Sequence, residues 1–441
     1  MIKNDFFELF RKAHWVLTLL ISGVMSYPAI AAEMHPEPLL LHASRVFDGS
    51  QFRDNLSILI KNGQVSQVNR RDLMSIDEGT KVIDLGDATV LPGLIELHAH
   101  LSYRNVPADI VLQHGITTIR DLGGPVHQPY GGNGSLRVLT SGPILTAHDG
   151  YPIVNLGASN IAKAVSSEEE AERVVRELIG AGAVVIKVAL EPGGEIGAPW
   201  SVHHDHGEHS HDHHGKHTHE HQEYGHMHNN KQVSHQHSNS DSDHSFDSKQ
   251  AWPLLSEKIV TAIVNEAHSH DRSVTAHVAE EKGVQIALNA GVDEWAHMPC
   301  DEVPDALLKQ AISQNVKIVA TIDTLSKCTG IERNTKLWSE LGGKILYGAE
   351  IAHPEIPWGI NTQELLYMMQ LTGMSLVEAL RAATSLAGEH LKLFPKVGTI
   401  QQGSPADIIA VRGDLALDLK KLEYPELVIS GGQIVVNRFS D

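Results

Sequence analysis

Two histidines in one short segment, His98 and His100, are the first residues of this chain whose type and spacing suggest chemistry. They follow the largely apolar segment 90–97, and because side chains alternate along a strand, both imidazoles would point to the same face. Neutral imidazole binds zinc and similar divalent ions, so one strand would supply two ligands. Two solvated histidines at a strand end are the simpler alternative, and the pair alone does not exclude it.

Lys187 lies inside an apolar segment. Residues 183–190 have the length and the β-branched content of a buried parallel strand, where a cationic ammonium is costly to bury. The cost is avoided if the pKa of Lys187 is lowered, or if its amine reacts with carbon dioxide to give an anionic carbamate that can bridge two metals. The alternative is a lysine whose side chain extends from the strand end to water.

Two further histidines and one acid lie at the ends of apolar segments later in the chain. His277 lies near the end of segment 273–278, His297 near the end of 293–298, and Glu350 directly follows 344–349. In parallel-barrel enzymes the C-terminal ends of the strands carry the chemistry. We therefore expect these side chains to meet at one end of a sheet.

Together these residues resemble the amidohydrolase superfamily, and within it the imidazolonepropionase and prolidase-like members. The resemblance covers about residues 39–437. It implies a metal-dependent hydrolase on a (β/α)8 barrel, with two divalent ions, expected to be zinc, and a carbamylated lysine between them. The implied metal ligands are, in chain order, His98, His100, Lys187, His277, His297 and Glu350.

Glu350 departs from the family pattern, which has aspartate after the eighth strand. Glutamate keeps the carboxylate but adds a methylene, so it must be presented from a displaced backbone or a different rotamer. Preorganised catalysis tolerates such a shift poorly. The resemblance makes Glu350 the catalytic base as well as a ligand, and the extra methylene bears on activity more than on fold.

The length and the apolar segments agree with an α/β fold of the TIM-barrel type. Residues 93–390 without the segment 203–248 number 252, close to the ~250 of such barrels. Eight strands are predicted, at 94–98, 116–121, 136–140, 183–190, 273–278, 293–298, 316–322 and 344–349.

The segments on both sides of the predicted barrel alternate apolar and polar residues, as β-strands do. Segment 57–68 alternates around Asn62-Gly63, a strong hairpin signal, and segment 427–436 does so around Gly431-Gly432. Neither end can bury a face alone. We therefore predict one small β-sandwich domain formed by both termini, from residues 39–92 and 391–437.

The first residues predict export. Lys3, Arg11 and Lys12 precede an apolar run that ends in the small-residue pattern Ala29-Ile30-Ala31, as in a cleaved signal peptide spanning residues 1–31. An uncleaved anchor helix is the alternative, but Pro28 ends a membrane span poorly. The expected location is periplasmic or secreted, with no stable membrane anchor after cleavage.

The net charge of −19 argues against nucleic acid as a partner.

The chain has two cysteines, Cys300 and Cys328. Export permits a disulfide between them, and two free thiols remain the alternative because bridging depends on their separation. The oligomeric state is not predicted.

Segment 203–248 contains 15 of the chain's 29 histidines and almost no apolar residues. It is predicted to be a disordered His-rich insertion within the barrel, able to bind metal through its imidazoles; a tolerated low-complexity expansion is the alternative. The accessory metal-binding candidates are His203, His204, His206, His209, His211, His213 and His214.

The expected function is hydrolysis of a small amide, dipeptide, cyclic amide or lactone by a metal-bridged hydroxide. Candidate substrate-binding residues in the loops after the strands are His148, Tyr151, Lys327, His353 and Trp358. The rival class is a non-catalytic periplasmic zinc-binding or metal-buffering protein on the same scaffold. Phosphotriesterase-like or deaminase activity is a lesser enzyme alternative.

Overall fold

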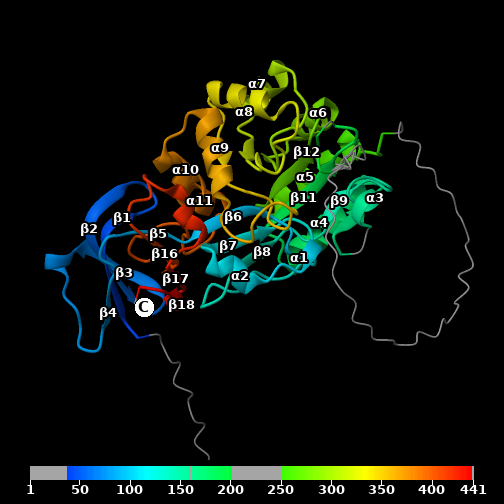
Figure 1. Ribbon diagram of the computed structural model, residues 1–441. Coiled ribbons are helices and arrows are strands. Elements are labelled where there is room, and N and C mark those ends of the chain that lie inside the picture. The colour runs from blue at the N-terminus through cyan, green and yellow to red at the C-terminus, as the bar shows by residue number, and fades with distance from the viewer. Residues whose placement is uncertain (1–36, 158–159, 196, 201–250, 440–441) are drawn as a thin grey trace, which may run out of the picture. The chain divides into compact units, whose positions relative to one another are not determined.

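The computed structural model describes residues 37–157, 160–195, 197–200 and 251–439, and it shows an α/β fold with three sheets (Figure 1). The predicted signal peptide, 1–31, and the predicted His-rich insertion, 203–248, lie outside these residues. In the part of the chain that is described, no helix is both long enough and apolar enough to cross a membrane.

One mixed sheet joins the two ends of the chain. Its strands run in the order β18-β17-β16-β5-β1-β2-β3, with β4 beside β1. The antiparallel pairing of β5 with β16 connects the N-terminal strands to the C-terminal ones. The predicted Asn62-Gly63 hairpin is confirmed between β2 and β3, with φ of 52° and 74° at the turn residues. The strands are β1 (Leu39–Phe47), β2 (Phe52–Lys61), β3 (Gln64–Arg70), β4 (Lys81–Asp84), β5 (Ala88–Pro92), β16 (Ile408–Arg412), β17 (Leu427–Ser430) and β18 (Gln433–Asn437).

The remaining strands are all parallel and form two sheets, β6-β7-β8 and β10-β9-β11-β12-β13-β14-β15. Each of the eight predicted segments contains a strand: β6 (Leu94–Ala99), β7 (Ile116–Asp121), β8 (Arg137–Thr140), β11 (Val185–Leu190), β12 (Ser273–Val278), β13 (Glu294–Trp295), β14 (Lys317–Val319) and β15 (Ile345–Leu346). Two short strands, β9 (Ile144–Thr146) and β10 (Ala162–Ala164), were not predicted.

Hydrogen bonds connect these two parallel sheets at both sides. The amide of Val184, just before β11, donates to the carbonyl of Thr140 at the end of β8 (2.9 Å). At the other side, Ala99 of β6 forms a parallel bridge with Ile351, whose carbonyl accepts from the amide of His100 (2.9 Å). The ten strands are therefore linked into one hydrogen-bonded array.

Helices follow most of these strands, and two of the longest begin at a capping serine. Ser167 caps α4 (Glu168–Ala181), and Ser256 caps α5 (Glu257–Ser269), each accepting from a first-turn amide. Their buried faces pack on the sheet and on each other. The other helices are α1 (Leu101–Arg104), α2 (Ala108–Gln113), α3 (Ile153–Leu156), α6 (Glu281–Ala290), α7 (Asp305–Ser313), α8 (Ile331–Glu340), α9 (Thr362–Thr372), α10 (Leu376–Ala382) and α11 (Ser385–His390), with 3-10 turns Arg71–Leu73 and Leu419–Glu423.

Two covalent or ionic links hold strands that are distant in sequence. Cys300, after β13, and Cys328, after β14, form a disulfide with a Cα–Cα distance of 5.0 Å, which decides between the two alternatives left by the sequence. Arg120 of β7 and Glu294 of β13 pair at 2.7 Å with both side chains buried. Burial alone would raise the pKa of Glu294, but Arg120 and His390 hold it well below its usual range.

Candidate active site

His98 lies on β6, and His100 directly follows the strand, yet the two side chains meet as the sequence predicts. Their Nε2 atoms are 3.1 Å apart, and both side chains are buried. Nδ1 of His98 donates to the carbonyl of Ala296 (2.7 Å). Because a neutral imidazole carries one N–H, this bond leaves Nε2 of His98 with a free lone pair.

His277 of β12 and His297, which follows β13, complete a cluster of four buried rings, here called the histidine cluster. The ring centroids of His98 and His297 are 4.5 Å apart, and those of His277 and His297 are 4.7 Å apart. Nδ1 of His297 is 2.8 Å from Oγ1 of Thr321. One ring nitrogen of His297 is thus occupied by a neighbour, and the other remains available.

The histidines of this cluster are neutral at physiological pH. Burial lowers the pKa of His98, His277 and His297 well below the ordinary value, and the charge of Lys187 acts in the same direction. Burial also lowers the pKa of His100, although Glu350 opposes the shift. Neutral imidazole is the form that binds a metal ion.

Lys187 is 1% exposed, and its Nζ has no hydrogen-bond partner in the described chain. The alternative of a side chain that reaches water is therefore wrong. Burial lowers the pKa of Lys187 to about 7, against the raising effect of Glu350 and Glu294. An amine of that pKa is substantially neutral near pH 7, which is the nucleophilic form.

Glu350 brings a carboxylate to the histidine cluster. Its Oε1 lies 3.5 Å from Nε2 of His100, and its Oε2 lies 3.9 Å from Nδ1 of His297. Its φ is +64°, in the left-handed region that few non-glycine residues adopt. The sequence predicts a displaced backbone or a different rotamer for this glutamate, and that remains a prediction.

A second buried glutamate fixes the position of Glu350. Glu96 of β6 accepts hydrogen bonds from the amide of His98 (2.7 Å) and from the amide of Ala349 (3.0 Å). Burial raises the pKa of Glu96 to about 8, partly offset by these two amides. One side chain thus ties the His98 strand to the segment that carries Glu350.

Glu191 and Glu195 lie beside the histidine cluster and were missed by the sequence interpretation. Oε2 of Glu191 is 3.1 Å from Nε2 of His277, and its Oε1 accepts from the amide of Gly193 (2.6 Å). Burial, followed by the contact with Glu195, raises the pKa of Glu191 well above its ordinary value. Alternation along the strand was the available signal, because Lys187 and Glu191 are four residues apart and share a face.

Aromatic side chains border the histidine cluster. The ring of Tyr103 stacks on His100 at 4.2 Å, and the ring of Tyr151 lies 4.6 Å from His277. Trp200 lies 4.5 Å from His277, and Trp252 stacks on Tyr151 at 5.9 Å. Of these four rings, only Tyr151 was predicted as a site residue.

The other predicted substrate-binding residues differ in position. His353 is partly buried, its Nδ1 has no partner in the described chain, and its charge acts on His100 and His297. His148 is exposed, and Trp358 is 40% exposed. Lys327 is exposed and pairs with Glu355 at 3.6 Å. The structure thus brings Tyr151 and His353 to the histidine cluster and leaves the other three near the surface.

A group of three of the predicted ligands fits a metal ion most closely. One ligand atom each of His98, His297 and Glu350 lies within 4.8 Å of the others, and all three residues are buried. Three nearby buried atoms have no partner in the described chain: Nδ1 of His100, Nζ of Lys187 and Oε2 of Glu350. Buried polar atoms are normally satisfied, so this arrangement of neutral rings and orphaned atoms fits bound cations.

Known proteins with similar sequences and folds include several hydrolases. Ochratoxinase of Aspergillus niger is 27% identical over 199 residues, 42% of this chain and 42% of its own length, so the match spans less than half of that protein. A solved Xaa-Pro dipeptidase superposes with a TM-score of 0.66 at 22% identity, over 90% of this chain and 99% of its own. A solved putative prolidase of Bifidobacterium longum gives 0.67 at 22% identity, over 92% and 97%.

At 22% identity, the similarity to these two solved structures establishes the fold. The family description "Amidohydrolase family" matches residues 89–435 of the chain, which include all of the predicted metal ligands. The match extends from β5 to β18 and so takes in strands of both chain ends. This chain is a member of the amidohydrolase family.

Proposed function

We propose that the protein is an exported hydrolase that uses two divalent metal ions to cleave a small amide, dipeptide, cyclic amide or lactone. The observation that carries the proposal is the convergence of four buried neutral histidines, a buried lysine without a partner and a carboxylate on one site. Family membership supports hydrolysis. The names of the similar proteins, ochratoxinase, Xaa-Pro dipeptidase and prolidase, support an amide-type bond.

The scaffold that we propose is a closed (β/α)8 barrel spanning residues 93–390. The eight predicted strands are parallel, and hydrogen bonds from Val184 to Thr140 and from His100 to Ile351 support closure. The buried Arg120–Glu294 pair joins strands that are not neighbours in the sheets, as expected across a barrel interior. The terminal sheet surrounds a core of its own, which supports a β-sandwich of residues 39–92 and 391–437.

The metal ions would be held by the six predicted ligands, with zinc as the expected metal. When bound, they would lower the pKa of water and polarise the carbonyl to be cleaved. The neutral amine of Lys187 can add to carbon dioxide and lose a proton, which would supply a carbamate as a further ligand. The ligand set is His98, His100, Lys187, His277, His297 and Glu350.

Side chains of the protein would transfer the proton and exclude water during the reaction. The Glu350 carboxylate, 3.5 Å from His100, would take a proton from the attacking water and deliver it to the leaving amine or alcohol. The rings of Tyr103, Tyr151 and Trp200 border the cluster and would exclude water around the scissile bond. Their apolar faces favour a substrate with an aromatic or other apolar group beside that bond.

The experiment is a metal analysis of the purified protein, followed by a screen of N-acyl amino acids, dipeptides, cyclic amides and lactones. About two tightly bound divalent ions per chain and turnover of at least one class are expected. The variant H98A/H100A is the matched control and should lose both. Bound metal without turnover of any class would favour the metal-buffering alternative, and turnover that survives metal removal would refute the proposal.

A further inference from the structure

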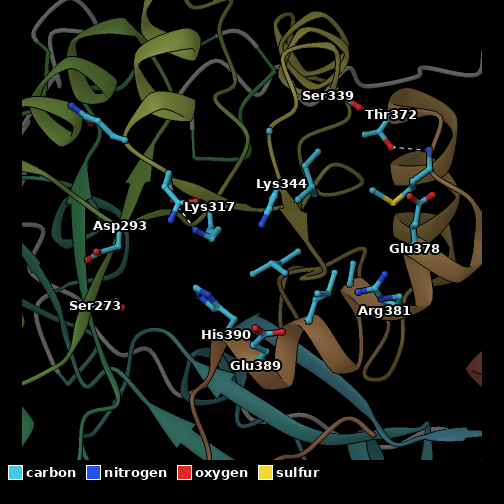
Figure 2. A pocket seen from close by; sticks show the side chains of 18 of the residues that line it. Ser273, Asp293, Lys317, Ser339, Lys344, Thr372, Glu378, Arg381, Glu389 and His390 are labelled. Carbon is cyan, nitrogen blue, oxygen red and sulfur yellow. Dashed lines mark hydrogen bonds between the residues drawn. The ribbon is translucent and has the colours of Figure 1, made fainter. Parts of the chain in front are cut away.

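A cavity of about 1140 Å³ lies at the opposite ends of the strands from the histidine cluster. It is lined by Asp293, which precedes β13, by Lys317, which begins β14, and by Lys344, which precedes β15. Residues of α8 to α11 form the rest of the wall (Figure 2). The histidine cluster lies at the other ends of the parallel strands, so this cavity is separate from the proposed active site.

Three acceptor groups in the wall of the cavity already accept hydrogen bonds. A carboxylate oxygen of Asp293 accepts from the amide of Val274 (2.8 Å) and lies 2.8 Å from Nε2 of His268. Glu378 accepts from the amide and the hydroxyl of Ser375, each at 2.8 Å. The carbonyl of Lys344 accepts from the indole N–H of Trp338 (3.2 Å).

The cationic side chains in the wall are not paired with acids. Lys317, Lys344, Arg381 and Lys392 form no ion pair with any carboxylate of the described chain. Nζ of Lys317 donates only to the carbonyl of Asn315 (2.7 Å), and Nε of Arg381 is buried without a partner. The carboxylate of Glu389, which is exposed, also lines the cavity. The wall groups without an ion pair in the described chain thus include four cations and two acids, Glu378 and Glu389.

The cations face one another across the hollow. Figure 2 shows the side chains of Lys317, Lys344 and Arg381 directed toward the open space, with His390 beside them. Burial lowers the pKa of Lys317, and repulsion by Lys344 adds to this effect, which is the interaction expected of two ammonium groups that share a cavity. An anion between them would replace repulsion by attraction.

We propose that this cavity binds a small organic anion whose carboxylate or phosphate group lies among Lys317, Lys344 and Arg381. Arginine presents a planar fork that matches either group, and each lysine adds a compact charge. A volume of about 1140 Å³ exceeds that of an inorganic ion and is at the upper end for drug-sized ligands. The ligand is therefore an organic molecule with an anionic end, bound at a cavity separate from the histidine cluster.

The test is calorimetric titration of the full-length protein with citrate and, separately, with inorganic phosphate, at pH 8, where histidines are neutral. Saturable binding of at least one probe is expected, and it should weaken as sodium chloride is added. Binding of citrate alone would assign a carboxylate ligand, and binding of phosphate alone a phosphate ligand. No saturable binding of either probe would overturn the proposal.

Variants separate this cavity from other sites. K317M/K344M should weaken binding at least tenfold, whereas K309M, which removes an exposed lysine of α7 outside the cavity, should leave it unchanged. Because Lys344 is exposed, K344Q alone is expected to fold normally and to show a smaller loss. H98A/H100A should bind the probes as the parent does. Equal binding by the parent and the two cavity variants, or loss of binding only in H98A/H100A, would refute the assignment.

Discussion

Glu350 presents its carboxylate from a backbone that side chains rarely adopt. Its φ is +64°, and two residues later Ala352 has a φ of +94°. Such conformations cost on the order of 1–3 kcal/mol each and persist where the surroundings enforce them. Here Glu96 holds the amide of Ala349, and Ile351 pairs with Ala99. Strain is therefore concentrated where glutamate stands in place of the family's aspartate.

The first prediction concerns the charge and the length of this side chain. E350Q should keep most of the bound metal but lower kcat by at least about 100-fold, because an amide cannot carry the proton. E350D should retain or raise activity, since aspartate is also more frequent than glutamate in the left-handed region. Metal content and kcat on a substrate found in the screen are the measurements.

Two outcomes would change the assignment of Glu350. An E350Q variant as active as the parent would remove the residue from the mechanism. A parent that is inactive on every substrate, with activity only in E350D, would favour the metal-buffering alternative over the hydrolase.

The second prediction concerns Glu191, which occupies one ring nitrogen of His277 at 3.1 Å. Carboxylates that hold a ligating histidine typically change metal affinity about 10–100-fold when replaced. E191Q should therefore weaken metal binding about tenfold, as measured by competition with a chelator. The matched control is E302Q, which replaces an exposed glutamate in the loop after β13 and should leave the metal affinity unchanged. Unaltered affinity in E191Q would show that His277 does not depend on this contact.

At the scale of the elements, buried carboxyl groups connect helices and strands to the loops of the site. Glu364 of α9 is fully buried and accepts from the amides of Ile322 (2.9 Å) and Asp323 (2.7 Å), which follow β14. Burial raises its pKa to about 8, although these amides act in the opposite direction. The helix thus anchors the loop adjoining Thr321, the neighbour of His297.

The third prediction follows from the sign of that shift. A folded-state pKa raised above the unfolded value means that stability is present at low pH and is lost as the pH rises toward 8. Between pH 6 and pH 9 the parent should lose about 2 kcal/mol of unfolding free energy through this group. E364Q should show a smaller loss over the same range, in chemical denaturation of metal-free protein. An identical pH dependence in parent and variant would contradict the raised pKa.

At the scale of the whole molecule, every proposed metal ligand lies outside the His-rich segment. The histidine cluster, Lys187 and Glu350 all lie outside residues 201–250. The contacts that hold them, such as Glu96 with Ala349 and Thr321 with His297, also come entirely from described residues. We therefore expect the proposed tight metal site to form without the segment.

The fourth prediction is that deletion of residues 203–248 leaves about two tightly bound divalent ions per chain, because every proposed ligand remains. The deletion should remove weaker metal binding that declines as the pH falls through the histidine range, since protonated imidazole cannot bind a metal. Metal titration of both forms at pH 7.5 and pH 5.5 is the measurement. Loss of all tight metal on deletion would overturn the proposed metal site.

The sequence by itself determined features that depend on local periodicity. Alternation along a strand placed His98 and His100 on one face, and the same rule accounts for Lys187 with Glu191. The Asn62-Gly63 turn and the eight apolar segments were also recognisable, because turn chemistry and buried strands leave a local pattern.

Contacts between distant segments were decided only by the tertiary structure. Glu191 meets His277 across 86 positions, and Glu96 meets Ala349 across 253, so no sequence periodicity relates them. The Cys300–Cys328 disulfide depends on a Cα separation that two loops set together. The cavity around Lys317 and Lys344 arises because strand starts and helix ends converge there. The sequence determined which groups are available, and packing determined which of them share a site.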